Sequence, residues 1–137
     1  MGRIIFLILF CIAVNGDIQT HIYISKELNW YEAQAYCRHY HTDLSYFNSQ
    51  SEIDKLRKDA GGSISKGWIG LQRDPNNDAV WMWSGGGHIT YANWARGEPN
   101  YYRRIEDKGL IGSDGKWYDS SGIYSRPFYC IDVTVME

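Results

Sequence analysis

Residues 81–100 read WMWSGGGHITYANWARGEPN, and this stretch decides the fold because a strand pattern gives way within it to a long loop. GWIGL and VWMWS are short strand patterns separated by the turn-rich connection QRDPNNDA. From Gly85 to Asp107 no regular periodicity remains. Long loops in compact domains are usually functional or disordered. We expect this loop to be ordered, because it contains Trp94, Pro99 and several tyrosines.

Two helices are expected before these strands. The first, NWYEAQAYCRHY, begins at Asn29, whose side chain can cap the helix together with Glu32. Its buried face follows spacings of 3, 4 and 3 residues and consists of Trp30, Ala33, Cys37 and Tyr40. The second, SQSEIDKLRKDAGG, has a capping box from Ser49 and Glu52 and ends at the glycine pair 61–62. Its core-facing residues are Ile53, Leu56 and Ala60.

Strand patterns stand on both sides of the helices. HIYIS precedes them, and GLIG, KWYD and RPFYCIDV follow the long loop. Helices grouped ahead of most strands predict an α+β domain. The chain shows no internal repeats and no linker, and its length fits one domain.

The first sixteen residues, MGRIIFLILFCIAVNG, have the pattern of a secretory signal peptide, with a cut expected after Gly16. Their apolar run is too short for a bilayer, which needs about 20 residues; a buried N-terminal strand or helix is the alternative. We predict a secreted, extracellular domain at residues 17–137, with its core at about 22–131 and no membrane span. The ending CIDVTVME lacks a polar tail, so we expect a fragment or one module of a longer protein.

Composition argues against two classes of function. The net charge of −2 gives no basic footprint for nucleic acid. No Ser/His/Asp or Cys/His arrangement has supporting context, and the histidines show no metal-ligand spacing. Paired acids could mimic a glycosidase, but here they stand beside Asn and Pro, so we predict no catalysis. The six Trp and eleven Tyr suit both a core and a binding surface.

Two cysteines remain after the signal peptide, since Cys11 lies within it. In a secreted protein an even pair predicts a disulfide, here between Cys37 and Cys130, with two free thiols as the alternative. The bridge would join the first helix to the last strand. The chain-entropy account assigns such a loop roughly 4–5 kcal/mol.

Seven motifs in a fixed order resemble the C-type lectin-like domain over nearly all of the mature length. They are NWYEAQAYCR, DLSYFNSQSEIDKL, GWIGL, WMWSGGGHITYANW, GEPN, KWYD and PFYC. The sequence at the beginning and at the end of the domain looks most like bony-fish tandem lectin domains related to the macrophage mannose receptor. The resemblance implies two helices flanking small antiparallel sheets, a calcium-binding loop, and a Cys37–Cys130 bridge. The family's second disulfide would fall at Lys108 and Gly122, and its loss should loosen the loop.

The resemblance also gives the triplet Glu98-Pro99-Asn100 a function, because in the family it binds calcium and sugar. A cis bond before Pro99 would turn the Glu98 and Asn100 side chains the same way. Calcium prefers six to eight oxygens, and Glu106 and Asp119 would add further ligands. Two sugar hydroxyls would complete the sphere, donating to carboxylate and accepting from amide. The Glu-Pro-Asn order implies mannose-type sugars, including glucose and N-acetylglucosamine, with fucose as an equivalent.

One residue departs from the family pattern, since Trp-Asn-Asp is here Trp117-Tyr118-Asp119. A phenol is a poor calcium ligand, so we expect weak calcium binding, at about 10⁻⁴–10⁻³ M or beyond. Tyr118 could instead stack on a sugar ring as part of the carbohydrate site. Trp94 would pack beneath the loop.

Other charged residues near the loop have two interpretations each. An auxiliary calcium site would use Asp74, Asp78 and Asp107, joined by Glu106; the alternative is a solvated turn. Arg103 and Arg104 would contact an anionic glycan through their planar forks, or would simply be solvated.

Three functions compete. The leading hypothesis is a secreted, calcium-dependent lectin for mannose-, N-acetylglucosamine- or fucose-type glycans, acting in innate recognition of microbes. The second is a calcium-independent module that binds a protein ligand, which would explain Tyr118. The third is ice binding, which some fish members of the fold have acquired. Fold alone does not choose among them.

Overall fold

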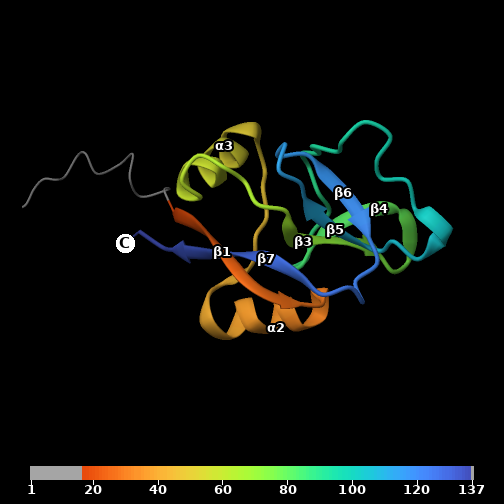
Figure 1. The fold of residues 1–137 in the computed structure, drawn as a ribbon, viewed down its shortest axis with the longest axis horizontal. Helices are drawn as coiled ribbons and strands as arrows, with labels where there is room; N and C mark the ends of the chain where they lie inside the picture. Colours follow the sequence, from red (N-terminus) through yellow and green to blue (C-terminus); the bar gives the residue numbers. More distant parts are fainter. Residues whose placement is uncertain (1–16, 137) are drawn as a thin grey trace, which may run out of the picture.

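The computed structural model describes residues 17–136 (Figure 1). The predicted signal peptide at 1–16 lies outside the described residues. The order of the main elements is β1 (Ile18–Leu28), α2 (Trp30–Tyr40), β2 (Asp43–Leu44), α3 (Gln50–Asp59), β3 (Gly67–Asp74), β4 (Asn77–Trp83), a short 3₁₀ helix (Tyr102–Arg104), β5 (Lys108–Ile111), β6 (Trp117–Ser120) and β7 (Arg126–Thr134). The α+β class and the predicted strands are confirmed, and the short β2 was not foreseen.

The strands form one sheet in the order β1-β7-β3-β5-β6, with β2 added to β7 and β4 to β3. β1 and β7 are antiparallel, so the two ends of the described chain lie side by side at Ile18 and Thr134. β3 contacts β7 in parallel at Trp68 and Phe128. In Figure 1 the long loop lies on the side opposite these ends, beyond β3, β4 and β6.

Local chemistry explains where α2 begins and which face it buries. The Asn29 side chain accepts from the Glu32 N–H, and the Glu32 carboxylate accepts from the Asn29 N–H, which completes the predicted capping box. Trp30, Ala33 and Cys37 are buried. Tyr40 was predicted to share that face, but the residue is 63% exposed; it is the last residue of the helix, and its ring packs against that of Tyr36 at 4.7 Å.

The second helix, α3, is capped less completely. Ser49 accepts from the Glu52 N–H, but the Glu52 carboxylate accepts from the N–H of Asn48 and not of Ser49. The predicted capping box is therefore only half formed. Gly61 and Gly62 end the helix with φ of 80° and 99°, a conformation that favours glycine.

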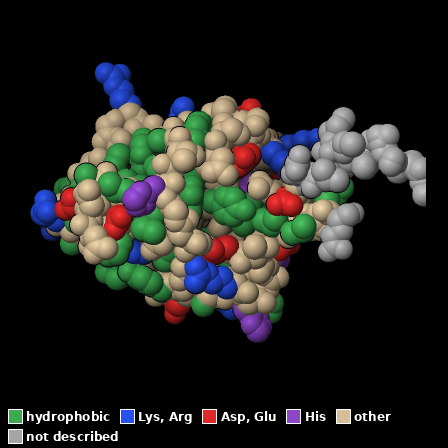
Figure 2. Space-filling view, turned by 180° about the vertical axis from the view of Figure 1, so that it is seen from behind, with side chains coloured by type: hydrophobic (Ala, Val, Ile, Leu, Met, Phe, Trp, Pro, Cys, Tyr) green, Lys and Arg blue, Asp and Glu red, His purple; other side chains and the backbone are tan. Residues whose placement is uncertain are grey.

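Two apolar clusters form the core. One gathers around α2 and contains the confirmed disulfide between Cys37 and Cys130, whose Cα atoms lie 5.3 Å apart. The other lies between α3 and the sheet and contains Trp81, Trp83 and Trp117. Within residues 17–136 no helix is long and apolar enough to cross a membrane. On the face shown in Figure 2, acidic and basic side chains are interspersed with hydrophobic ones.

Candidate functional site

The long loop is anchored to the core by tryptophan rings. Trp94 is partly buried, and its ring centroid lies 4.9 Å from that of Trp81 and 5.8 Å from that of Trp117. The backbone is tied to β6 as well, because the Ala95 N–H donates to the Trp117 carbonyl and the Trp117 N–H donates to Asn93, each at 2.9 Å. Trp94 therefore packs beneath the loop and fixes the segment that leads into the triplet.

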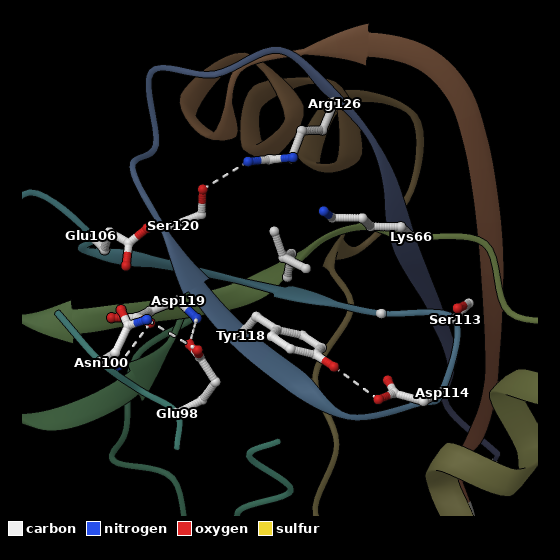
Figure 3. A pocket seen from close by; sticks show the side chains of 12 residues that line it. Lys66, Glu98, Asn100, Glu106, Ser113, Asp114, Tyr118, Asp119, Ser120 and Arg126 are labelled. Carbon is white, nitrogen blue, oxygen red and sulfur yellow. Dashed lines mark hydrogen bonds between the residues drawn. The ribbon is translucent and has the colours of Figure 1, made fainter. Parts of the chain in front are cut away.

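The triplet turns two polar side chains toward one pocket. The Glu98–Pro99 peptide bond is cis. The Asn100 amide donates to Glu98 Oε2 at 3.2 Å, and Glu98 Oε1 accepts from the Asp119 N–H at 3.3 Å. Figure 3 shows Glu98, Asn100 and Glu106 together beside β6. The structure thus brings together an acid and an amide that the sequence placed two residues apart.

Asp119 lies beneath the triplet and supports its backbone. Its Oδ1 accepts from the Asn100 N–H at 3.0 Å, and its Oδ2 accepts from the Tyr101 N–H at 2.7 Å. Oδ2 also pairs with the Arg73 guanidinium at 2.9 Å, and the Asp119 side chain has no exposed surface. Several donors to one buried carboxylate are needed, because an unpaired buried charge is strongly unfavourable.

Arg73 supports the site, and sequence reasoning missed it. Its Nε donates to the Glu106 carbonyl at 2.9 Å and a terminal nitrogen donates to the Asp78 carbonyl at 2.6 Å. Its guanidinium lies 3.8 Å from the centre of the Tyr101 ring and 4.5 Å from that of Trp81. One buried cation therefore joins β4, the loop and β6, and no sequence motif signals it.

Glu106 completes the acidic side of the pocket after a tight turn. Its carboxylate accepts from the Tyr102 N–H at 3.1 Å. Tyr101, Arg103 and Arg104 all have positive φ, of 48°, 54° and 59°. This backbone conformation costs roughly 1–2 kcal/mol per non-glycine residue. The turn is thus held by its contacts, and these return Glu106 to the triplet.

Crowding of acids shifts their proton affinities. Burial, followed by the adjacent Asp119, raises the pKa of Glu98 to about 7. Burial also raises the pKa of Glu106, and the charge of Asp119 acts in the same direction. Partly desolvated carboxylates close to one another repel. A cation bound at this side of the pocket would relieve that repulsion.

Tyr118 points away from the triplet. Its hydroxyl donates to Asp114 Oδ2 at 2.8 Å, and its half-buried ring lies along the pocket between Glu98 and Asp114 (Figure 3). Gly112 permits this placement, since a Cβ there would lie 2.8 Å from the ring. The phenol oxygen is therefore engaged elsewhere, and the ring forms part of the pocket surface.

The chain matches a known protein family over most of its length. The family model described as "Lectin C-type domain" matches residues 26–131. The chain belongs to the C-type lectin domain family. It is 31% identical over 122 residues to L-selectin of Bos taurus, covering 83% of this chain and 32% of that protein. It is 34% identical over 107 residues to the low affinity immunoglobulin epsilon Fc receptor of Homo sapiens, covering 78% and 32%.

Solved structures agree with this assignment. The cow C-type carbohydrate-recognition domain of CD23, determined in the presence of a GlcNAc2Man3 oligosaccharide, matches with a TM-score of 0.74 and 25% identity, covering 86% of this chain and 90% of that one. The chain spans about a third of the length of L-selectin and of the Fc receptor. The bony-fish assignment stays a prediction.

In this lectin domain the donor chemistry at the triplet suits calcium. Two carboxylates and an amide carbonyl, from Glu98, Glu106 and Asn100, are the oxygen ligands that calcium prefers. As they stand, no three His, Cys, Asp or Glu side chains among residues 17–136 converge closely enough to hold a metal ion. Binding would require the Glu98 and Asn100 side chains to exchange their mutual hydrogen bond for the ion.

The three acids considered for an auxiliary calcium site do not converge. Asp74 accepts from His88 at 3.1 Å, Asp78 pairs with Arg104 at 3.1 Å, and Asp107 pairs with Lys108 at 2.8 Å. The Arg73 guanidinium instead joins Asp119 to the backbone at Asp78 and Glu106.

The two positions of the family's second disulfide are adjacent in space. A Cβ on Gly122 would lie 2.8 Å from Cγ of Lys108. The Lys108 ammonium lies 5.0 Å and 4.9 Å from the rings of Trp30 and Tyr31, and the Gly122 N–H donates to Asp107 at 3.3 Å. Polar and cation–π contacts therefore stand where the sulfur bridge would be.

Proposed function

We propose that this chain is a secreted domain that binds mannose-type glycans in a calcium-dependent manner through Glu98, Asn100 and Glu106. The observation that carries the proposal is that these three side chains line the same pocket, held by Asp119 and Arg73 from below. Membership of the C-type lectin domain family supports carbohydrate binding. The cow CD23 structure in the presence of an oligosaccharide supports the glycan class.

Each residue has a distinct part in the proposal. When bound, calcium would supply a Lewis-acidic centre that two vicinal sugar hydroxyls can join. Glu98 and Glu106 accept hydrogen bonds from those hydroxyls, and the Asn100 amide donates to them. Asp119, which the sequence predicted as a further calcium and sugar ligand, is given another part in this proposal: its carboxylate is fully buried and paired with Arg73, and it orients the backbone of the triplet. Tyr118 presents one ring face on which a sugar can pack.

A second function is favoured by specific observations. Asp119 is already engaged with Arg73, and Tyr118 replaces an amide, so the loop could be ordered without calcium. The human Fc receptor relative is named for a protein ligand. In this alternative the domain binds a protein through the same face, and chelator leaves that binding unchanged.

A mannose-affinity column separates the two proposals. The wild-type protein should be retained in millimolar calcium and released by chelator, whereas Glu98→Gln should pass through. Glu27→Gln is the matched control, because Glu27 is exposed on β1 and lies outside the pocket. Equal retention of the Glu98→Gln and wild-type proteins would contradict the calcium-dependent site. Secretion and a part in innate recognition of microbes belong to the same proposal.

A further inference from the structure

A second group of polar side chains shares the pocket with the triplet. The pocket has a volume of about 480 Å³, which is within the range of small-ligand sites. Glu98, Asn100 and Glu106 line one side, and Lys66 and Arg126 line the other. Figure 3 shows the ends of both basic side chains pointing into the pocket, with the Tyr118 ring nearby. The pocket therefore has an acidic side and a basic side.

Neither basic side chain of the pocket is engaged in an ion pair within the described part of the chain. Among the ion pairs of the described residues, none includes Lys66 or Arg126. Lys66 is exposed and Arg126 is half-buried. By contrast Arg104, which sequence analysis considered for an anionic glycan, is paired with Asp78, and neither it nor Arg103 lines the pocket.

Arg126 is held in a defined orientation. One terminal nitrogen donates to the Ser120 hydroxyl at 2.9 Å. The guanidinium lies 5.1 Å from the centre of the Trp68 ring and 5.6 Å from that of Tyr124. An arginine fixed in this way loses little side-chain entropy when it binds an anion, and its planar fork matches carboxylate and sulfate.

We propose that Lys66 and Arg126 form a subsite for an anionic substituent, a carboxylate or a sulfate, on the glycan whose hydroxyls bind at Glu98 and Asn100. This inference rests on the proposed function and names its ligand class more closely. The sugar ring would lie over Tyr118, with its hydroxyls toward the acidic side and its anionic group toward the basic side. Simple neutralisation of Glu106 by Arg126 is the competing role.

Paired sugars that differ only at one substituent test the subsite. N-acetylglucosamine is compared with its 6-sulfate, and glucose with glucuronate, all as multivalent conjugates in the same calcium concentration. The first pair tests sulfate and the second tests carboxylate. We expect the anionic member of at least one pair to bind about tenfold more tightly, as for a hydrogen bond to a charged group. That preference should shrink as salt rises.

Variants assign the preference to named residues. Arg126→Gln should remove the preference, and Lys66→Gln should reduce it about twofold to fivefold, as for an exposed pair. Both should bind the neutral sugars like the wild type. Arg103→Gln is the control, because it removes the same charge from an exposed site outside the pocket. Lys66→Gln also guards against a folding defect in Arg126→Gln, since Lys66 is exposed.

Three results would overturn the inference. Equal binding of neutral and anionic sugars by the wild type would remove the subsite and leave the proposed function intact. A parallel loss for neutral and anionic sugars in the Lys66 and Arg126 variants would assign these residues to neutralisation of the acids. Failure of folded protein to bind any of the four sugars in calcium would end both the inference and the proposed function.

Discussion

The disulfide end of the molecule (α2, β1 and β7) and the loop end (residues 85–107 with β6) are stabilised in different ways. At the disulfide end, Trp30, Ala33 and Phe128 are buried around the Cys37–Cys130 bridge. At the loop end, a buried pair of charges and a set of tryptophan rings hold a chain that has almost no regular structure.

This difference explains why the proposed binding residues lie at the loop end. Apolar burial is non-directional and tolerates small shifts of individual groups. The Arg73–Asp119 pair is directional, and it fixes the backbone N–H groups of Asn100 and Tyr101 that precede the turn to Glu106. Polar ligands need donors and acceptors at defined positions, and the loop end supplies them.

The largest effect is expected from removing the bridge. The Cys37→Ala/Cys130→Ala double variant should lose about 4–5 kcal/mol of unfolding free energy, because the bond closes a loop of 93 residues. Urea unfolding measures this loss. In the fraction that remains folded, retention on the mannose column should match the wild type. Loss of retention in well-folded protein would show that the two ends are not independent.

A somewhat smaller effect is expected from breaking the buried charge pair. Arg73→Met should cost about 3–4 kcal/mol, since it leaves the Asp119 carboxylate buried without its cation. Lys55→Met removes the exposed Lys55–Asp59 pair and should cost about 0.5 kcal/mol or less. Amide hydrogen exchange should rise at residues 99–106 in Arg73→Met and stay unchanged there in Lys55→Met. Unchanged exchange in both would contradict the role given to Arg73.

Lowering the pH should reduce the unfolding free energy of the protein, because His21 in β1 is buried. Burial lowers the pKa of His21 to about 4, from 6.5 in an exposed chain, so the folded state holds it neutral. The unfolded state binds more protons below pH 6.5, and stability is therefore lost as pH falls from 6.5 to 4. The loss at pH 4 is about 3 kcal/mol.

Comparing the wild type with His21→Asn separates the contribution of His21 to the pH dependence of stability from the contributions of Glu98 and Glu106, whose pKa values are raised. Unfolding of the wild type and of His21→Asn is measured at several pH values between 7 and 4. The wild type should lose stability relative to the variant across this range. A constant difference would mean that His21 titrates normally in the folded protein.

The smallest effect is expected at the surface of the loop end. Arg104→Gln breaks the pair with Asp78, whose two side chains are 75% and 52% exposed. Unfolding free energy should change by about 0.5 kcal/mol or less, and thermal unfolding should detect little. A change as large as that of Arg73→Met would place the stabilising charge of the loop at Arg104.

The two ends also differ in how far sequence predicts them. At the disulfide end the Asn29 cap and the 3.6-residue period are local signals; the cap is confirmed, and the period is confirmed for Trp30, Ala33 and Cys37. The bridge is confirmed although its cysteines are 93 residues apart, because only two cysteines follow the predicted signal peptide. Tyr40 was wrongly placed in the core, because periodicity continues the buried face up to the last residue of the helix, where Tyr40 is exposed.

At the loop end only the triplet has a local signal. Arg73 could not be found from the sequence, because its partners Asp78, Glu106 and Asp119 lie 5, 33 and 46 residues away and belong to other elements. The direction of Tyr118 depends on Asp114 and on the space above Gly112. Lys66 directly precedes β3 and Arg126 begins β7, and both line the pocket because these two strands are neighbours in the sheet.

The most direct test of the account is a glycan array probed with the purified protein in millimolar calcium and again with chelator. The account predicts signal on mannose-, N-acetylglucosamine- or fucose-bearing glycans that disappears with chelator. Absence of signal in both conditions, from protein shown to be folded, or signal that chelator leaves unchanged, would contradict a calcium-dependent site at Glu98, Asn100 and Glu106.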